Sequence, residues 1–377
     1  MKMRVATLCY LERTGWKFGG APVEDPQLVI WFAAYGQARL PGVYEGLKER
    51  FPNALIAGCS TNGEIFGGEA MDGACVAAAI RFDDTQLKAA YEVIEPGADA
   101  RAAGRRLAGG LQADELKGVY LLADAFSFNG ADLVDGLIEA LPEGVVVSGG
   151  MAGDDAKLGT ATLAGLDEAP RQGGALAIGF YGSRVRINHG VAGGWDALGP
   201  SRHVTRSVGP VVYELDGQPA LLVYERLVGD AGTNARLRHP FAFKPDVDSA
   251  QDVIREVVGI DRENNGVIFI DNVPQGCFGQ ILRGSDEHLV DGAGLAARRA
   301  GMDKANDQSL SLVVSCIGRK WVMGQRIGDE VEAVQDESPG TPMIGFYSYG
   351  EIAPHERTGL CTLHHASVSV TLLSEAA

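Results

Sequence analysis

A repeated unit of strand, helix, strand, glycine turn and acid constrains this chain more than any other feature of its sequence. In the first copy, an apolar strand over 28–33 precedes a helical stretch and the turn Gly58–Glu64. In the second copy, a strand over 119–123 precedes another helical stretch and the turn Gly149–Asp154. Self-similarity of this kind is typical of a duplicated supersecondary unit. We therefore interpret the two segments as an internal duplication.

A third echo of the unit lies near the C-terminus. The run Leu312–Cys316 is a predicted strand, and the later segment Gly345–Ile352 matches Gly58–Ile65 at four of eight positions. The chain contains 51 glycines, so coincidence is the alternative to a third copy. The sequence leaves both interpretations open.

Short apolar runs alternate with helical patterns along the whole chain, which is typical of an α/β protein with helices flanking its sheets. Two pairs of runs are separated by few residues and are predicted hairpins: 74–82 with 87–94, and 175–181 with 185–189. We therefore expect mixed sheets. The turn-rich segment Gly193–Pro200 predicts a boundary between two associated halves, residues 1–200 and 201–377.

Charge and composition exclude several classes of protein. Asp and Glu outnumber Lys and Arg by 49 to 33, so the formal charge of −16 disfavours nucleic acid as a partner. No apolar stretch approaches the ~18 residues of a membrane helix, and the N-terminus lacks a signal-peptide pattern. The six cysteines are far apart and form no CxxC pair, which indicates reduced thiols. We expect a cytoplasmic protein without a membrane anchor.

Five motifs occur in order along nearly the entire chain. Together they resemble the N-terminal and C-terminal parts of the FIST family of sensory proteins. The motifs are Gly58-Cys-Ser-Thr-Asn-Gly-Glu64, Gly149-Gly-Met-Ala-Gly-Asp154, Gly194-Trp195 with Leu198-Gly-Pro200 and Val204-Thr205, Ser315-Cys-Ile-Gly-Arg-Lys320, and Gly345-Phe-Tyr-Ser-Tyr-Gly-Glu-Ile352.

The resemblance implies a ligand-binding sensory module of bacterial signal transduction. Some members of the family are described as haem proteins that sense nitric oxide and act on a histidine kinase or a cyclic-di-GMP enzyme. This chain shows no kinase, receiver or output segment, so a signal would pass through a separate partner protein, and a homo-oligomer is a further possibility. Where family members commonly carry a His-Asn-Gln-Thr run, this chain has His364-His365-Ala366-Ser367.

The first candidate ligand contacts lie in a glycine turn. Glycines just after a strand let backbone N–H groups approach a ligand, and Ser60, Thr61 and Asn62 add donors and acceptors there. The alternative is that these glycines only make tight turns.

The second group of candidates lies in the C-terminal half, around Cys316, Arg319 and Glu351. An arginine just past a strand end pairs well with a carboxylate, either on a ligand or on Glu351. Tyr347 and Tyr349 alternate along a predicted strand and should share one face, as the wall of a pocket or as core residues.

Three functions remain open on the sequence. A b-type haem needs an axial ligand, for which His189, His239, His364 and His365 are candidates, although a structural or surface role is the alternative for each. Without haem, the chain is a receptor for a small polar metabolite such as an amino acid. A thiol enzyme using Cys59 or Cys316 ranks below both, because no nucleophile elbow, Walker or zinc-protease motif occurs.

Overall fold

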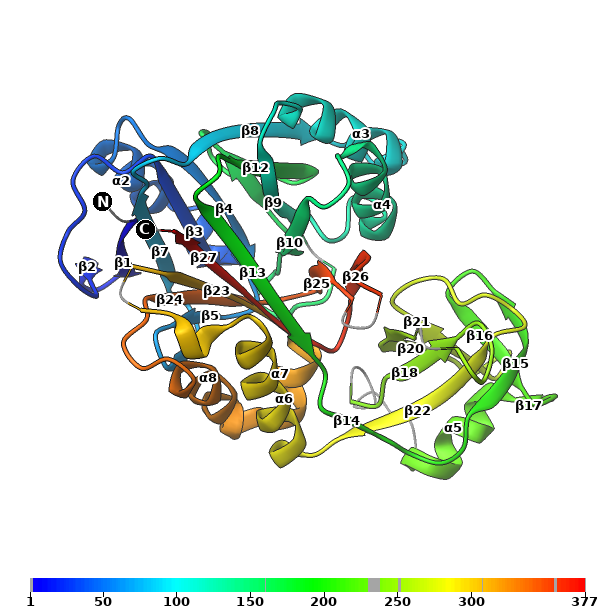
Figure 1. The fold of residues 1–377 in the computed structure, drawn as a ribbon. Helices are drawn as coiled ribbons and strands as arrows, with labels where there is room; N and C mark the ends of the chain where they lie inside the picture. Colours follow the sequence, from blue (N-terminus) through cyan, green and yellow to red (C-terminus); the bar gives the residue numbers. More distant parts are fainter. Residues whose placement is uncertain are drawn as a thin grey trace.

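The computed structural model describes residues 3–159, 161–229, 238–249, 252–306, 308–355 and 358–376. Figure 1 shows a large body of sheets and helices with a smaller sheet domain beside it. The chain leaves the body after β13 (Val185–Ala192) and returns to it with α6 (Asp286–Arg299). The N- and C-terminal segments therefore build the same body.

The body consists of three units in which four strands have the same order. Two parallel strands, joined through helical segments, lie at one side of each unit, and two further strands continue the sheet in antiparallel pairing. In the first unit the order is β4 (Leu55–Thr61), β3 (Leu28–Ala34), β7 (Cys75–Arg81) and β1 (Arg4–Leu11), with α1 (Tyr35–Ala38) and α2 (Pro41–Arg50) between the parallel strands.

The other two units repeat this order with different helices. The second unit runs β10 (Val146–Met151), β9 (Leu116–Ala123), β12 (Gly174–Tyr181) and β8 (Gln86–Val93), with α3 (Ala100–Leu111) and α4 (Gly130–Ala140). The third runs β24 (Met343–Ser348), β23 (Leu310–Cys316), β27 (Val368–Glu375) and β13, with α6, η1 (Met302–Lys304), α7 (Ile317–Met323), η2 (Gly324–Arg326) and α8 (Ile327–Asp336). The third echo in the sequence is thus a third copy of the unit.

Each unit passes one strand to a neighbouring sheet. β5 (Glu64–Phe66) follows β4 but pairs with β24, β25 (Gly350–Pro354) follows β24 but pairs with β10, and β11 (Ala164–Leu166) follows β10 but pairs with β4. The exchanges join the units in a closed ring with approximate threefold symmetry. Three shorter strands extend the sheet edges: β2 (Gly15–Phe18), β6 (Glu69–Met71) and β26 (Cys361–His364).

Corresponding backbone hydrogen bonds close the ring at its centre. A residue just past β4, β24 or β10 donates its N–H to a carbonyl of the next unit, at 2.8–3.3 Å. The three bonds are Asn62 to Tyr347, Tyr349 to Met151, and Gly153 to Ser60. In the register of the exchanged strands, Glu64 and Glu351 occupy corresponding positions, and Ala164 occupies the same position in the remaining exchanged strand. Asp154, the acid of the predicted second repeat, is therefore not their counterpart and lies in a longer loop.

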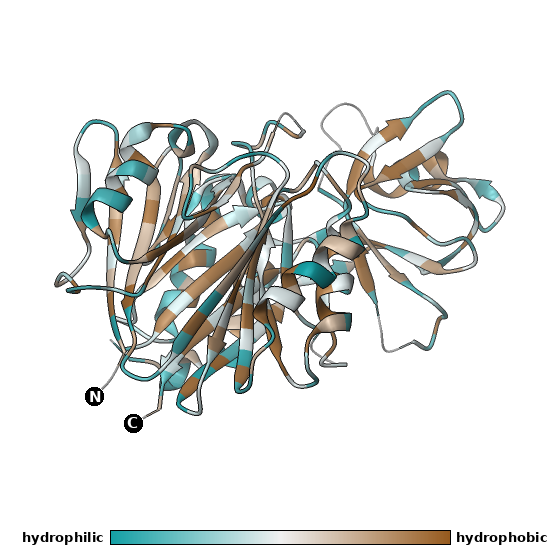
Figure 2. Cartoon of the chain, turned by 90° about the horizontal axis from the view of Figure 1, so that it is seen from above, coloured by the Kyte–Doolittle hydropathy of each residue, from teal (hydrophilic) through white to brown (hydrophobic). Residues whose placement is uncertain are grey.

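The sheets are apolar because their inner faces pack together in the middle of the body. Phe32, Leu176 and Phe346, one from each unit, lie in one buried cluster, and the rings of Phe32 and Phe346 are 4.5 Å apart. Figure 2 shows hydrophobic residues concentrated along the strands and hydrophilic residues gathered in the loops. Burial of this apolar surface is the main stabilising contribution to the ring.

Both predicted hairpins are wrong. β7 belongs to the sheet of the first unit and β8 to that of the second, while β12 and β13 likewise lie in different sheets. Each short connection carries the chain from one sheet to the next, because the apolar faces of the strands pack across the shared core instead of side by side. The prediction of mixed sheets is confirmed.

The inserted domain is a strongly bent sheet with its own core. Phe241, Phe243 and Phe269 form an aromatic cluster with ring centroids 5.0–5.6 Å apart. The predicted boundary after residue 200 falls between β14 and β15, inside this insert. Its elements are β14 (Trp195–Ala197), β15 (Arg202–Val208), β16 (Val211–Leu215), β17 (Gln218–Pro219), α5 (Ala220–Val228), β18 (Phe241–Lys244), β19 (Val253–Arg255), β20 (Val257–Asp261), β21 (Gly266–Phe269) and β22 (Phe278–Gly284).

Candidate functional site

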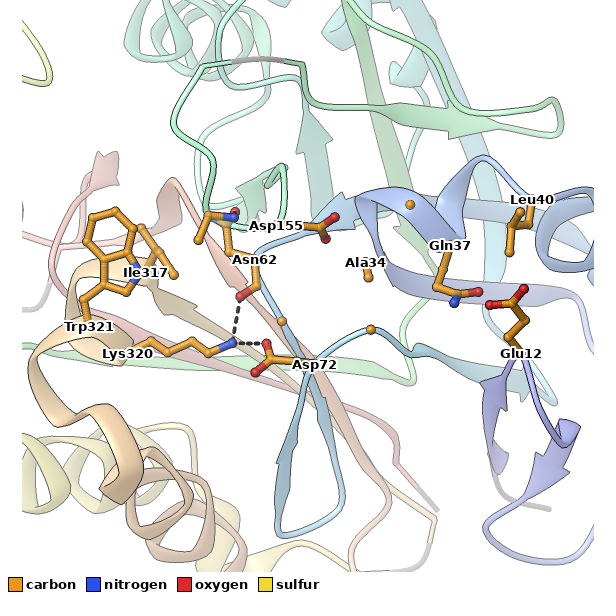
Figure 3. A pocket seen from close by; sticks show the side chains of 14 residues that line it. Glu12, Ala34, Gln37, Leu40, Asn62, Asp72, Asp155, Ile317, Lys320 and Trp321 are labelled. Carbon is orange, nitrogen blue, oxygen red and sulfur yellow. Dashed lines mark hydrogen bonds and ion pairs between the residues drawn. The ribbon is translucent and has the colours of Figure 1, made fainter.

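A cavity of about 660 Å³, here called the central pocket, opens where loops of all three units meet. It lies beyond the carboxyl ends of the parallel strands, the place where open α/β sheets bind ligands. Its volume falls within the ~300–1,000 Å³ of typical small-molecule sites. The side chains labelled in Figure 3 are Glu12, Ala34, Gln37, Leu40, Asn62, Asp72, Asp155, Ile317, Lys320 and Trp321.

Lys320 supplies the positive charge of the central pocket. The ammonium group donates to the Asn62 carbonyl oxygen at 2.9 Å and to the Asp72 carboxylate, and it lies 4.8 Å from the ring centre of Tyr347. The side chain of Lys320 is 15% exposed, whereas that of Asp72 is 79% exposed. Asp72 therefore approaches Lys320 from the solvent side, and a ligand carboxylate can take its place.

Negative charge lies toward the other end of the pocket. Figure 3 shows Glu12 and Gln37 on the side opposite Lys320, with Asp155 between them. One oxygen of Asp155 accepts a hydrogen bond from the Tyr35 N–H at 2.7 Å, which fixes the carboxylate at the start of α1. The pocket thus offers an ammonium group at one end and carboxylates at the other.

The predicted glycine turn lines this pocket with Asn62 and Gly63, but not with Ser60 or Thr61. Ser60 donates to the Gly153 carbonyl oxygen at 2.6 Å, and Thr61 donates to the buried Glu64 carboxyl, so both hydroxyls are engaged inside the protein. Asn62 is 2% exposed, and its side-chain oxygen accepts from two backbone N–H groups of the 154–156 loop at 2.9 Å. Gly63 has a φ of 128°, and a Cβ there would lie 2.2 Å from the Lys320 nitrogen. Glycine is therefore required beside the lysine.

Arg319, adjacent to Lys320 in sequence, points away from the central pocket into the protein. It is fully buried and donates to Glu330 at 2.6 Å, to the Leu289 carbonyl oxygen at 2.8 Å and to the Gly193 carbonyl oxygen. The alternative of an ion pair with Glu351 is wrong, because the guanidinium pairs with Glu330. Its three contacts fix α7 against α8, α6 and the start of the insert.

Glu351 is held by serines instead. It accepts from Ser348 at 2.6 Å and from the backbone and hydroxyl of Ser367 at 3.1 and 2.8 Å. Burial raises the pKa of the Glu351 carboxyl to about 8. These bonds tie the end of β24 to the start of β27.

The two tyrosines do not share a face. Tyr347 lies in the buried cluster that contains Ile65 and Val331, whereas the Tyr349 hydroxyl donates to Asp154. The expectation of one aromatic wall is wrong, because β24 ends at Ser348 and the chain turns before β25 begins. Tyr347 lies beneath the Lys320 ammonium group but is fully buried, and neither tyrosine lines the central pocket.

The cysteines proposed as nucleophiles are buried. Burial raises the pKa of the thiols of Cys59 and Cys316 well above the ordinary value, so neither is a thiolate at neutral pH. The Cys316 thiol donates to Glu256 of the insert at 3.0 Å, and burial raises the pKa of Glu256 to about 7. This contact joins the body to the inserted domain.

The histidine candidates separate into two groups. His189 is half-buried on β13, and His239 contacts the Leu282 carbonyl oxygen at 3.2 Å. His364 and His365 border a second cavity of about 180 Å³, here called the histidine pocket. Its lining comprises residues 191–193, 252–254, 355, 362–365 and 367.

The residues of the histidine pocket do not fit haem. Its volume is below the ~300–1,000 Å³ of pockets that enclose drug-sized molecules, and haem is at least as large as such a molecule. The Nε2 atom of His364 is already 2.9 Å from the Ala353 carbonyl oxygen. In the part of the chain that the structure describes, no group of three or more His, Cys, Asp or Glu side chains is placed to hold a metal ion.

Sequence reasoning missed most of the central pocket. Lys320 belongs to the motif Ser315–Lys320, but the sequence pattern favoured its neighbour Arg319 as the ligand contact. Asp72 and Asp155 lie in loops without a local pattern, and only the ring of units brings them to Lys320.

Comparisons with known proteins place the chain in a family. No curated protein matches it. Among solved structures, the crystal structure of cyanuric acid hydrolase from A. caulinodans is similar over 100% of both chains, at 8% identity and a TM-score of 0.36. Within the described residues, no helix has the length and apolarity needed to cross a membrane.

The family models cover almost the whole chain. The FIST N domain matches residues 27–218 and the FIST C domain matches residues 220–354. FIST domains are associated with sensing small ligands in signal transduction. The boundary between the two matched domains falls inside the insert, so each domain covers part of the body and part of the insert. The chain belongs to the FIST family.

Proposed function

We propose that this protein is a sensory receptor whose central pocket binds a small zwitterionic metabolite, an amino acid in the simplest case. The observation that carries the proposal is the distribution of charge in a cavity of about 660 Å³, with Lys320 at one end and Asp155 and Glu12 toward the other. A carboxylate and an ammonium on one small molecule match these two ends.

Binding of a carboxylate at Lys320 would replace the Asp72 contact. Asp72 follows β6, and β6 pairs with β5, the strand that the first unit passes to the third. The displaced loop therefore lies next to the pairing of β5 with β24, through which ligand binding can change the contact between the first and third units. We infer that a separate partner, such as a histidine kinase or a cyclic-di-GMP enzyme, reads the change.

The test is isothermal titration calorimetry against the common amino acids after a thermal-shift screen. We expect saturable binding by at least one amino acid and at least a tenfold loss of affinity in Lys320→Ala. Lys117→Ala removes an exposed lysine from β9, outside the pocket lining, and should bind as the wild type does. Equal affinities of wild type and Lys320→Ala would contradict the proposal.

The haem alternative is checked on the same preparation. A visible spectrum recorded after expression with ample haem, before and after nitric oxide, distinguishes the two functions. A Soret band at one haem per chain that shifts with the gas, combined with no amino acid binding, would replace the metabolite receptor by a gas sensor. The buried thiols of Cys59 and Cys316 give the thiol enzyme the least support.

A further inference from the structure

The histidine pocket corresponds to part of the central pocket under the threefold relation of the units. The backbone N–H two residues after Asp72 donates to Glu64 at 2.9 Å, and the N–H two residues after His365 donates to Glu351 at 3.1 Å. Since Glu64 and Glu351 are counterparts, Asp72 and His365 occupy corresponding positions before β7 and β27. One lines the central pocket and the other lines the histidine pocket.

The insert changes the surroundings of the second position. Residues 252–254 of the inserted domain form one wall of the histidine pocket, so this pocket lies between the body and the insert. Among the described residues, its ionisable lining groups are three imidazoles and the carboxylate of Asp252, whereas those of the central pocket are Lys320 and three carboxylates. The guanidinium of Arg255, next in the chain to the wall, lies close enough to His364 and His365 to act on both electrostatically.

His365 has no well-formed hydrogen bond among the described residues. The residue is 4% exposed, and its ring nitrogens make only a weak contact with the Tyr349 backbone. Burial lowers the pKa of the imidazole well below its ordinary value, so the ring is neutral and carries one N–H donor. A buried donor without a hydrogen bond costs free energy, so an acceptor that enters the pocket would stabilise the ring N–H.

We propose that the histidine pocket binds a small monocarboxylate through the His365 ring N–H, beside the Arg255 guanidinium, which also pairs with Asp271 at 3.1 Å. The volume of about 180 Å³ equals the share of roughly six water molecules, which suits an acid of about two to four carbons. Val191, Val253 and Ile254 supply apolar walls for its hydrocarbon part. Near pH 6 the Glu256 and Glu351 carboxyls do not repel the anion, because burial raises their pKa to about 7 and 8.

The probe is sodium acetate, titrated into the full chain at pH 6 and constant ionic strength, with acetamide as a neutral molecule of the same shape. We expect one saturable acetate site and at least tenfold weaker binding of acetamide. His365→Ala should weaken acetate at least tenfold, whereas His189→Ala, a half-buried histidine on β13 outside the pocket lining, should leave it unchanged.

A second variant keeps the test decisive if His365→Ala fails to fold. Val191→Phe fills the pocket from β13, leaves the imidazole in place and should also abolish acetate binding. No saturable acetate binding to the wild type, or unchanged affinity in Val191→Phe, would overturn the site. Acetamide binding as tightly as acetate would overturn the choice of an anion. Lys320→Ala should not alter acetate binding, so failure here is separable from failure of the metabolite receptor.

Discussion

The central pocket and the histidine pocket occupy related places in two units of one ring, yet their chemistry is opposite. The central pocket holds Lys320 and three carboxylates, whereas the histidine pocket lies between the body and the insert and holds imidazoles. In both units a buried glutamate, Glu64 or Glu351, accepts a hydrogen bond from the backbone just before the next strand. Repetition of the unit therefore built two equivalent recesses, and their loops decided what each accepts.

Arg319→Ala should have the largest effect, because this residue supports both pockets. Its guanidinium binds the Gly193 carbonyl oxygen in the wall of the histidine pocket, and α7 carries Lys320 into the central pocket. Removal leaves Glu330 buried and unpaired, which typically costs about 3–5 kcal/mol of unfolding free energy. Denaturant unfolding measures the loss.

The matched control is Arg326→Ala, which removes an exposed arginine of the same unit that pairs with Asp286 and Asp329. Its melting temperature should stay at the wild-type value, since exposed ion pairs contribute little. If Arg319→Ala were as stable as Arg326→Ala, the two pockets would not share this support.

Glu256→Gln tests the joint between the body and the insert. Burial raises the pKa of Glu256 from its ordinary value of 4.5 to about 7, so between these values the folded state binds more protons than the unfolded state. Stability from this group is therefore fully present below about pH 4.5 and is lost as pH rises through about 7. We expect the wild-type unfolding free energy to fall from pH 6.5 to 8, and Glu256→Gln to remove roughly 1 kcal/mol of that fall.

The window starts at pH 6.5 because the histidines act in the opposite direction below it. Burial lowers the pKa of His364 to about 4, so that group adds stability as pH rises toward 6.5. Glu263→Gln, on an exposed turn of the same insert, should keep the wild-type slope. A slope in Glu256→Gln identical to the wild-type slope would show that the joint does not titrate.

Asp72→Asn should have the smallest effect and concerns the central pocket alone. Removing the charge frees the Lys320 ammonium for a ligand carboxylate, so amino acid affinity should rise about two- to fivefold, the scale of one exposed ion pair. Glu69→Gln, an exposed change on β6 in the same hairpin, is the control. Calorimetry that finds weaker binding in Asp72→Asn would mean that Asp72 contacts the ligand itself.

The class of fold and its repetition follow from local features of the sequence. The strand, helix and strand pattern and the glycine turns persist because apolar strands, helical periodicity and positive-φ glycines are local properties. The motifs from Gly58–Glu64 to Gly345–Ile352 also sufficed to identify the family.

The tertiary structure alone decided how the units combine. Short connections between apolar strands predict hairpins, but β7 and β8 enter different sheets because a shared core buries both. A few consecutive residues cannot show which of these two pairings is more favourable. The sites depend on the same long-range step. Asp72, Asp155 and Lys320 come from three units, and His365 lies in a pocket formed by both the body and the insert, so no local pattern marks them.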